Sequence, residues 1–318
     1  MSRAGLLRLY RWLALAFALP LLAVIGSGLL LALEPIAHQA ALHPGTLTAD
    51  RLDGLLARHD PLGQAWFIAV KPYDDRLLIG APAPQPPLAV DLATGEPSHG
   101  GASVSDAYLA AKRLHNGLML DLRPLVLAST YAMLVLIVLA AAVGLPRLRE
   151  RLAGWPRAVA RVLLPLLVAS PLTGLLVAHG ITFAPVPQPS FGQPVPLREA
   201  VRIIHGAGHD LSGLVWLKSQ RGQVRARVIE GGEWRIYTVS ADGVAPLPQS
   251  WPHALHTGQV AGYWSGAANI AVALGLAALV GTGVLAWVRQ TTAARRAGAR
   301  GRRAAPEAGD AVGVRVRP

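Results

Sequence analysis

The sequence has 318 residues, of which 52% are hydrophobic and only 15% are charged, whereas globular proteins carry about 25% charged residues. The polar residues avoid four long apolar segments, so the composition indicates an integral membrane protein rather than a pair of soluble domains. Cysteine is absent, which excludes disulfides, thiolate catalysis, iron–sulfur clusters and cysteine-based zinc sites.

The four apolar segments are each long enough to cross a bilayer, because about 20 helical residues span its hydrocarbon core. In the first, Ser27 is the only polar side chain between residues 12 and 33, and no small-residue cleavage site follows, so we expect a retained helix. The third contains Pro165 and Pro171, breaks that neighbouring helices can compensate. The predicted transmembrane helices cover residues 12–35, 123–145, 162–184 and 266–288.

The basic residues predict the orientation of these helices. Three short segments hold 16 of the 30 Lys and Arg residues but only three of the 18 acidic residues, and cytoplasmic segments typically carry such an excess. We therefore expect residues 1–11, 146–161 and 289–318 in the cytoplasm, the last as a disordered tail. The net charge of +12 lies next to the spans, where topology and anionic membrane lipid explain it, so we expect no nucleic-acid partner.

The two long loops, 36–122 and 185–265, are expected outside the cytoplasm as small lobes of helix and antiparallel sheet. Thr48 is a candidate helix cap in the first lobe, and a helix is predicted at 196–206 in the second. Alternating apolar residues and turn signals predict strands at 65–70, 76–79, 88–91, 214–219, 223–230 and 234–240.

An internal repeat is visible in the sequence. Leu114-His115-Asn116-Gly117 precedes the second span and Leu255-His256-Thr257-Gly258 precedes the fourth, with the two histidines 141 positions apart. His38 and His179 are also 141 apart, whereas Ser27-Gly28-Leu29-Leu30 matches Thr173-Gly174-Leu175-Leu176 at an offset of 146, so the repeat contains a local gap. The pattern predicts a duplicated unit of span, outside lobe, LHxG element and span.

Four of the ten histidines, His38, His115, His179 and His256, are expected near the outer ends of the four spans. Neutral imidazole is a good axial ligand for haem iron, and a glycine two positions after His115 and His256 would leave room for a flat macrocycle. Two b-type haems would use all four histidines, whereas one would use two. Pairing across or within the halves is equally consistent, and interfacial histidines also simply hydrogen-bond headgroups, water or neighbouring helices. No catalytic residue and no site for a bare metal ion is predicted.

The sequence resembles the PepSY-associated transmembrane proteins, which include inner-membrane ferric-siderophore reductases. The resemblance covers about residues 5–290 and rests on Arg8-Leu9-Tyr10-Arg11-Trp12-Leu13, Ser27-Gly28-Leu29-Leu30, the two LHxG elements and Thr282-Gly283-Val284-Leu285-Ala286-Trp287. It implies a four-helix membrane bundle with two periplasmic α+β PepSY-like lobes in a bacterial inner membrane. It also implies one or two b-type haems and the reduction of ferric siderophores at the periplasmic face during iron uptake.

One position departs from the family pattern, because Tyr10 stands where the opening motif usually reads His-Arg-Trp. If that histidine serves a cytoplasmic-side haem in relatives, this chain lacks it, and quinol or a periplasmic donor becomes the expected source of electrons. Two alternatives to the reductase remain. One is a non-enzymatic scaffold whose lobes bind a periplasmic partner, a peptide or a metal, and the other is a regulator of a periplasmic protease.

Overall fold

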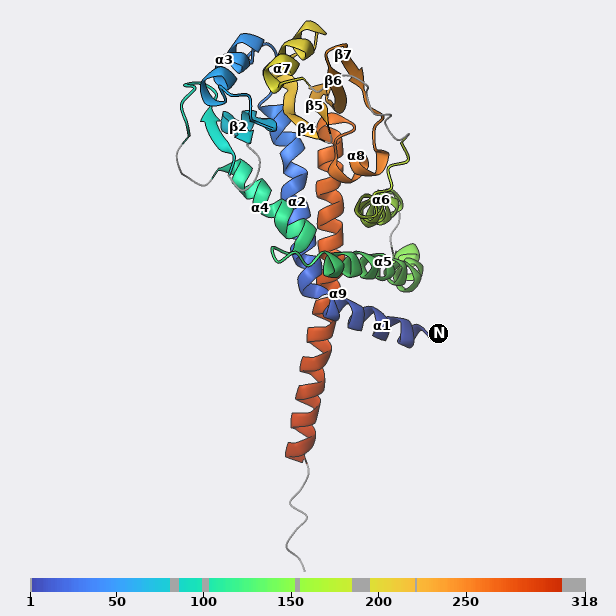
Figure 1. Cartoon of the computed structure of the whole chain (residues 1–318). Helices are drawn as coiled ribbons and strands as arrows, with labels where there is room; N and C mark the ends of the chain where they lie inside the picture. Colours follow the sequence, from blue (N-terminus) through green and yellow to red (C-terminus); the bar gives the residue numbers. More distant parts are fainter. Residues whose placement is uncertain are drawn as a thin grey trace, which may run out of the picture.

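The structure is a computed structural model that describes residues 2–80, 86–98, 103–151, 155–184, 195–220 and 222–304. A domain of sheet and short helices lies at one end of the molecule, and five longer helices extend from it (Figure 1). Two of these, α2 and α9, lie side by side along the length of the molecule, whereas α1 and α5 run across them. The five are α1 (Arg3–Ala16), α2 (Ala18–Ala40), α5 (Arg123–Arg151), α6 (Trp155–Ala178) and α9 (Gly262–Ala304).

Three helices among the described residues are long and apolar enough to cross a membrane: Ala18–Ala40, Arg123–Ala142 and Gly262–Arg289. The third predicted span differs, because its apolar helical part, Leu163–Ala178, is shorter. The first is also displaced from the predicted residues 12–35, since the helix breaks at Phe17 and continues through Pro35 to Ala40. Pro35 costs one backbone hydrogen bond, but it lies within a buried stretch that packs on α9, where Ile36 contacts Gly266.

The segments expected in the cytoplasm are partly helical. Helix α5 extends into residues 146–151, α6 begins at Trp155, and α9 continues over residues 289–304, where a disordered tail was predicted. Alanine, arginine and glutamine are strong helix formers, so this stretch extends the last apolar helix at little cost in free energy. Residues 305–318 and part of the 146–161 loop lie outside the described residues.

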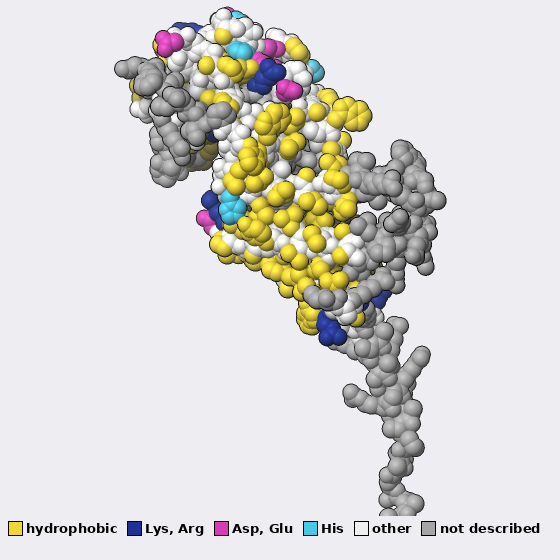
Figure 2. Space-filling view, turned by 90° about the vertical axis from the view of Figure 1, so that its right-hand side faces the viewer, with side chains coloured by type: hydrophobic (Ala, Val, Ile, Leu, Met, Phe, Trp, Pro, Cys, Tyr) yellow, Lys and Arg dark blue, Asp and Glu magenta, His cyan; other side chains and the backbone are white. Residues whose placement is uncertain are grey.

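The apolar helices expose hydrophobic side chains over a broad area. Figure 2 shows these side chains gathered below the sheet domain, which carries most of the charged side chains seen from that side. Leu19 on α2 is 81% exposed and Val138 on α5 is 63% exposed, although buried residues of the same helices form a common core. An exposed apolar surface of this extent is typical of contact with lipid.

The strands of both long loops form a single seven-stranded antiparallel sheet in the order β3-β2-β1-β4-β5-β6-β7. The two loops therefore share one sheet, where two separate lobes were predicted. Strand β1 of the first loop pairs with β4 of the second, with Ile68 opposite Leu217. Each loop alone would leave one of these strands as an unpaired edge, and the pairing removes both edges. The strands are β1 (Phe67–Lys71), β2 (Arg76–Gly80), β3 (Leu88–Asp91), β4 (Leu214–Gln220), β5 (Gln223–Glu230), β6 (Glu233–Ser240) and β7 (Gly243–Pro246).

One face of the sheet is covered by α3 (Ala49–His59) and α7 (Leu197–Gly206), one helix from each loop (Figure 1). Thr48 caps α3, as predicted, by accepting a hydrogen bond from the backbone N–H of Arg51. Buried residues from both loops form one hydrophobic core, in which Leu56, Ile68, Ile204 and Leu217 are at most 1% exposed. The predicted strands are confirmed to within a few residues, and the shared core makes the two loops one folded unit.

The two helices on this face are also joined by an ion pair. Asp53 on α3 accepts hydrogen bonds of 2.9 Å from both Arg198 and Arg202 on α7, and these bonds lower the pKa of Asp53 to about 2. A carboxyl group whose pKa is lowered in the folded state stabilises that state above its unfolded pKa of about 4. That contribution is lost as the pH falls from about 4 towards 2.

We therefore expect the substitution Asp53→Asn to lower the melting temperature at pH 7. The difference from the wild type should shrink steadily between pH 4 and pH 2.5. Thermal unfolding of both proteins across this range measures it, with Asp50→Asn as the control, because no hydrogen bond or ion pair of the Asp50 side chain is seen among the described residues. A pH-independent difference would contradict the role given to this ion pair.

Candidate functional site

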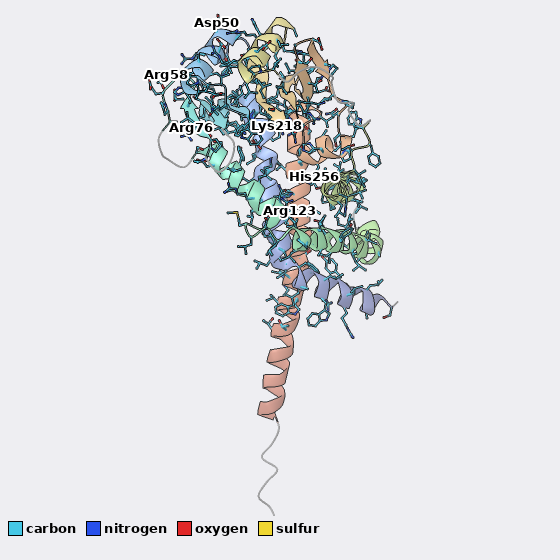
Figure 3. All side chains as sticks on the ribbon, in the orientation of Figure 1. Asp50, Arg58, Arg76, Arg123, Lys218 and His256 are labelled. Atoms are coloured by element: carbon cyan, nitrogen blue, oxygen red, sulfur yellow. The ribbon has the colours of Figure 1, made fainter. Side chains whose placement is uncertain are left out.

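Two of the four predicted histidines lie together where the sheet domain meets the long helices. His115 lies near the end of α4 (Val104–Gly117) and His256 near the end of α8 (Trp251–Thr257). Their ring centroids are 6.0 Å apart and the ring planes are tilted by 44°. Figure 3 shows His256 between α9 and α6. The two LHxG elements, which are far apart in the sequence, therefore bring their imidazoles to one place.

His115 is held against α2. Its Nδ1 is 2.9 Å from the carbonyl oxygen of Val24, and because a carbonyl only accepts hydrogen bonds, Nδ1 carries the proton. The same nitrogen is 3.3 Å from the hydroxyl of Ser27, whose own hydrogen bonds go to backbone carbonyls of α2. The ring packs on Gly28, where an added Cβ would lie 3.2 Å from its Cε1 atom.

His256 makes the same set of contacts with α6. Its Nδ1 is 3.1 Å from the carbonyl oxygen of Ser170 and 3.4 Å from the hydroxyl of Thr173. The ring packs on Gly174, where an added Cβ would lie 2.9 Å from Cε1. Asn269 on α9 donates a hydrogen bond of 3.1 Å to the backbone carbonyl of His256. The carbonyl, hydroxyl and glycine of α2 thus recur on α6, each 146 positions later.

These contacts leave the second ring nitrogen of both histidines available. Nε2 of His115 and Nε2 of His256 form no hydrogen bond within the described part of the chain. Burial lowers the pKa of His115, and burial together with the neighbouring His115 lowers the pKa of His256 to about 4. Both imidazoles are therefore neutral at pH 7, which is the form that ligates metals.

The separation of the two rings fits a shared metal. In such a site each imidazole nitrogen lies about 2.0–2.1 Å from the ion, and the ring centroid lies farther from the ion than the nitrogen does. The two ring centroids are then roughly 6 Å apart. A hydrogen bond from Nδ1 to a carbonyl is the usual way in which a ligating histidine is oriented. No group of three or more His, Asp or Glu residues that could hold a bare metal ion occurs among the described residues.

The other two predicted histidines lie elsewhere. His38 is 1% exposed and packs under the sheet between Tyr73 and Trp234, with ring centroids 4.8 and 5.2 Å away. His179 follows the end of α6, is exposed, and its Nε2 is 2.9 Å from the hydroxyl oxygen of Tyr131. The structure therefore brings His115 and His256 together across the two halves, and it places neither His38 nor His179 beside them.

Two glycines of the site were not expected from the sequence. Gly28 and Gly174 contact the imidazoles, although only Gly117 and Gly258 were expected to make room near them. Gly258 instead ends α8 in the left-handed conformation, with φ 69°. The matching Ser-Gly-Leu-Leu and Thr-Gly-Leu-Leu segments were the available signal, since they repeat with the histidines, but a sequence does not say that they face them.

Replacing Gly174 by alanine is expected to destabilise the protein, because the space beside Gly174 is tighter than that beside Gly28. In Gly174→Ala, the new Cβ would force the His256 ring away from the Ser170 carbonyl, and overpacking of this kind costs about 1–3 kcal/mol. Gly26→Ala is the control, because its Cβ would meet nothing within 4 Å and helix propensity would favour it. Thermal unfolding should show a lower melting temperature for Gly174→Ala alone, and equal values would contradict the contact.

A comparison with protein-family models matches residues 7–290 to the PepSY-associated TM region. No curated protein matches the chain. The match includes both LHxG elements, all four candidate histidines and the whole seven-stranded sheet.

Proposed function

Because the chain belongs to the PepSY-associated TM family, we propose that this membrane protein is a haem-dependent oxidoreductase. In this proposal it lies in a bacterial inner membrane and reduces ferric siderophores, or ferric iron in other chelates, at the periplasmic face during iron uptake. The observation that carries the proposal is the pair of neutral imidazoles, 6.0 Å apart, whose Nδ1 nitrogens are both committed to backbone carbonyls.

A b-type haem bound here would supply one-electron chemistry. The chain's own residues orient the ligands: the carbonyls of Val24 and Ser170 fix the tautomer of each ring, and Gly28 and Gly174 allow the rings to approach the helices closely. One haem between the two histidines would leave His38 and His179 for other tasks.

The proposed topology places the sheet domain in the periplasm and both termini in the cytoplasm. The distribution of basic residues along the sequence supports it, because residues 1–11, 146–161 and 289–318 hold 16 of the 30 Lys and Arg residues but only three acidic residues. Tyr10 on α1, at the position of the family's usual histidine, donates a hydrogen bond of 2.8 Å to the carbonyl of Leu279 on α9. If a histidine at this position serves a cytoplasmic-side haem in relatives, its replacement by Tyr10 favours quinol or a periplasmic protein as the electron donor.

An internal duplication accounts for the equivalence of the two histidine sites. The two halves share the order of span, outside segment and LHxG element, and each half contributes a carbonyl, a hydroxyl and a glycine to one imidazole. In this proposal His115 of one half and His256 of the other would together hold the cofactor.

An absorption spectrum of the detergent-purified full-length protein tests the function. Sharp α and Soret bands on reduction with dithionite, with one haem per chain in a pyridine haemochrome assay, would support it. A featureless spectrum after haem-supplemented expression would contradict the reductase and favour the non-enzymatic scaffold.

A further inference from the structure

A cavity opens near the histidine pair, between the end of α6, strand β6 and helix α8. Its volume is about 550 Å³, which lies within the range of about 300–1,000 Å³ typical of small-molecule sites. Val177 and Ile181 contribute apolar walls, and Arg227, Trp234 and His253 contribute polar groups. We call it the α6–α8 cavity.

Two residues that line this cavity each carry a hydrogen-bond donor without a partner among the described residues. The indole Nε1 of Trp234 and the guanidinium Nε of Arg227 are both buried and form no hydrogen bond among the described residues. Trp234 is only 6% exposed. An unpaired buried donor costs about 1–3 kcal/mol, and more if it is charged, so native proteins rarely keep two of them side by side without an acceptor.

The charge around Arg227 is also unbalanced. Its guanidinium lies over the rings of Trp216 and Trp234, 5.1 and 5.7 Å from their centroids, but forms no ion pair within the described ranges. On the same face of the sheet Lys218 lies opposite Arg225, a like-charge pair that destabilises a sheet. The nearby carboxylate of Glu34 is already engaged by Lys71, at 3.0 Å.

Figure 3 labels Lys218 on the sheet, on the side of the long helices, above the level of His256. His253 of the cavity and His256 of the histidine pair lie on the same short helix, α8, three residues apart. The cavity and the proposed haem site therefore share a wall. A molecule bound in the cavity would lie beside the proposed redox centre.

We propose that the α6–α8 cavity binds an organic anion, whose acceptor oxygens pair with the Arg227 guanidinium and the Trp234 indole N–H. This inference rests on the proposed function and assigns its substrate class: the iron chelate reduced by this protein carries negative charge and carboxylate groups. The planar fork of Arg227 matches a carboxylate in a bidentate arrangement, and the apolar walls match the carbon skeleton of the chelate. A neutral chelate would leave the cation unpaired.

The test is equilibrium binding to the purified full-length protein, measured by calorimetry with ferric citrate and with a neutral ferric trihydroxamate as probes. We expect the wild type to bind ferric citrate more tightly. Arg227→Gln should weaken ferric citrate binding at least tenfold without changing the haem bands. Arg227→Lys removes the planar guanidinium and Trp234→Phe removes the indole N–H, and each keeps a side chain of similar kind. Both should weaken ferric citrate binding by smaller factors. They provide the test if Arg227→Gln fails to fold.

Arg235→Gln is the matched control, because Arg235 lines the same cavity but is exposed and paired with Glu233 at 3.3 Å. It should change the affinity less than twofold. Equal affinity of wild type and the Arg227 and Trp234 variants for ferric citrate would overturn the inference. A loss of haem from Arg227→Gln with unchanged ferric citrate binding would also overturn it, since the cation would then serve the haem carboxylates. Ferric citrate binding that depends on Arg227 in a protein without haem would support the anion site while contradicting the reductase.

Discussion

Replacing either His115 or His256 by alanine is expected to abolish the reduced haem spectrum of the purified protein. Each substitution would remove one of the two imidazoles that would hold the haem. The loss should exceed the roughly 10–100-fold decrease in metal affinity that removal of a ligand-orienting group typically causes. Because both sites are built from equivalent contacts, we expect the two variants to lose haem to the same extent.

His179→Ala is the control, since His179 is exposed and contacts Tyr131 rather than the pair. Its haem content, measured by the pyridine haemochrome assay, should equal that of the wild type. Haem loss in His179→Ala and His38→Ala, with retention in His115→Ala, would contradict the assignment and favour the pairing of His38 with His179. Loss of half the haem in every variant would indicate two haems, each held by a different pair.

Leu217→Ala is expected to lower the free energy of unfolding of the sheet domain by about 2–5 kcal/mol. Leu217 is fully buried on β4 and lies opposite Ile68 on β1, so its side chain belongs to the core that both loops share. Truncation would leave a cavity that the surrounding strands and helices cannot fill completely.

The facing residues Leu217 and Ile68 also provide a test of whether the two loops fold as one unit. In a double-mutant cycle with Ile68→Ala, we expect the two losses to be non-additive by about 0.5–3 kcal/mol, as for residues in contact. Denaturant unfolding followed by tryptophan fluorescence measures each term. Leu62→Ala is the control, because Leu62 is 79% exposed and should change little. Strict additivity, or two separate unfolding transitions, would indicate independent lobes instead.

Local elements were predictable because their signals are local. Thr48 is followed by a helical pattern, and alternation with period two marks the strands, so their positions were correct to within a few residues. The helix end near Pro35 was not, since the helix continues through the proline to Ala40, and Pro35 and His38 are both buried there. Two separate lobes were also predicted wrongly, because nothing local in Phe67–Lys71 or Leu214–Gln220 indicates which strand will cover its edge.

The histidine pair shows the same difference between what local sequence signals predict and what tertiary contacts decide. The repeated LHxG elements identified His115 and His256 as equivalent, and the resemblance suggested their ligand chemistry, but four histidines allowed several pairings. The chain order says nothing about which two rings meet. Packing of α4 on α2 and of α8 on α6 brought these two within 6.0 Å and left His38 under the sheet.

The sequence by itself determined that this is a membrane protein of the PepSY-associated TM family, because long apolar segments and short motifs are properties of consecutive residues. It also identified the candidate ligands and the repeat to which they belong. Only the tertiary structure decided that both loops form one sheet, that Gly28 and Gly174 seat the imidazoles, and that Arg227 and Trp234 share a cavity. These features depend on contacts between residues far apart in the chain, whose free energy is realised only when all the surrounding elements pack together.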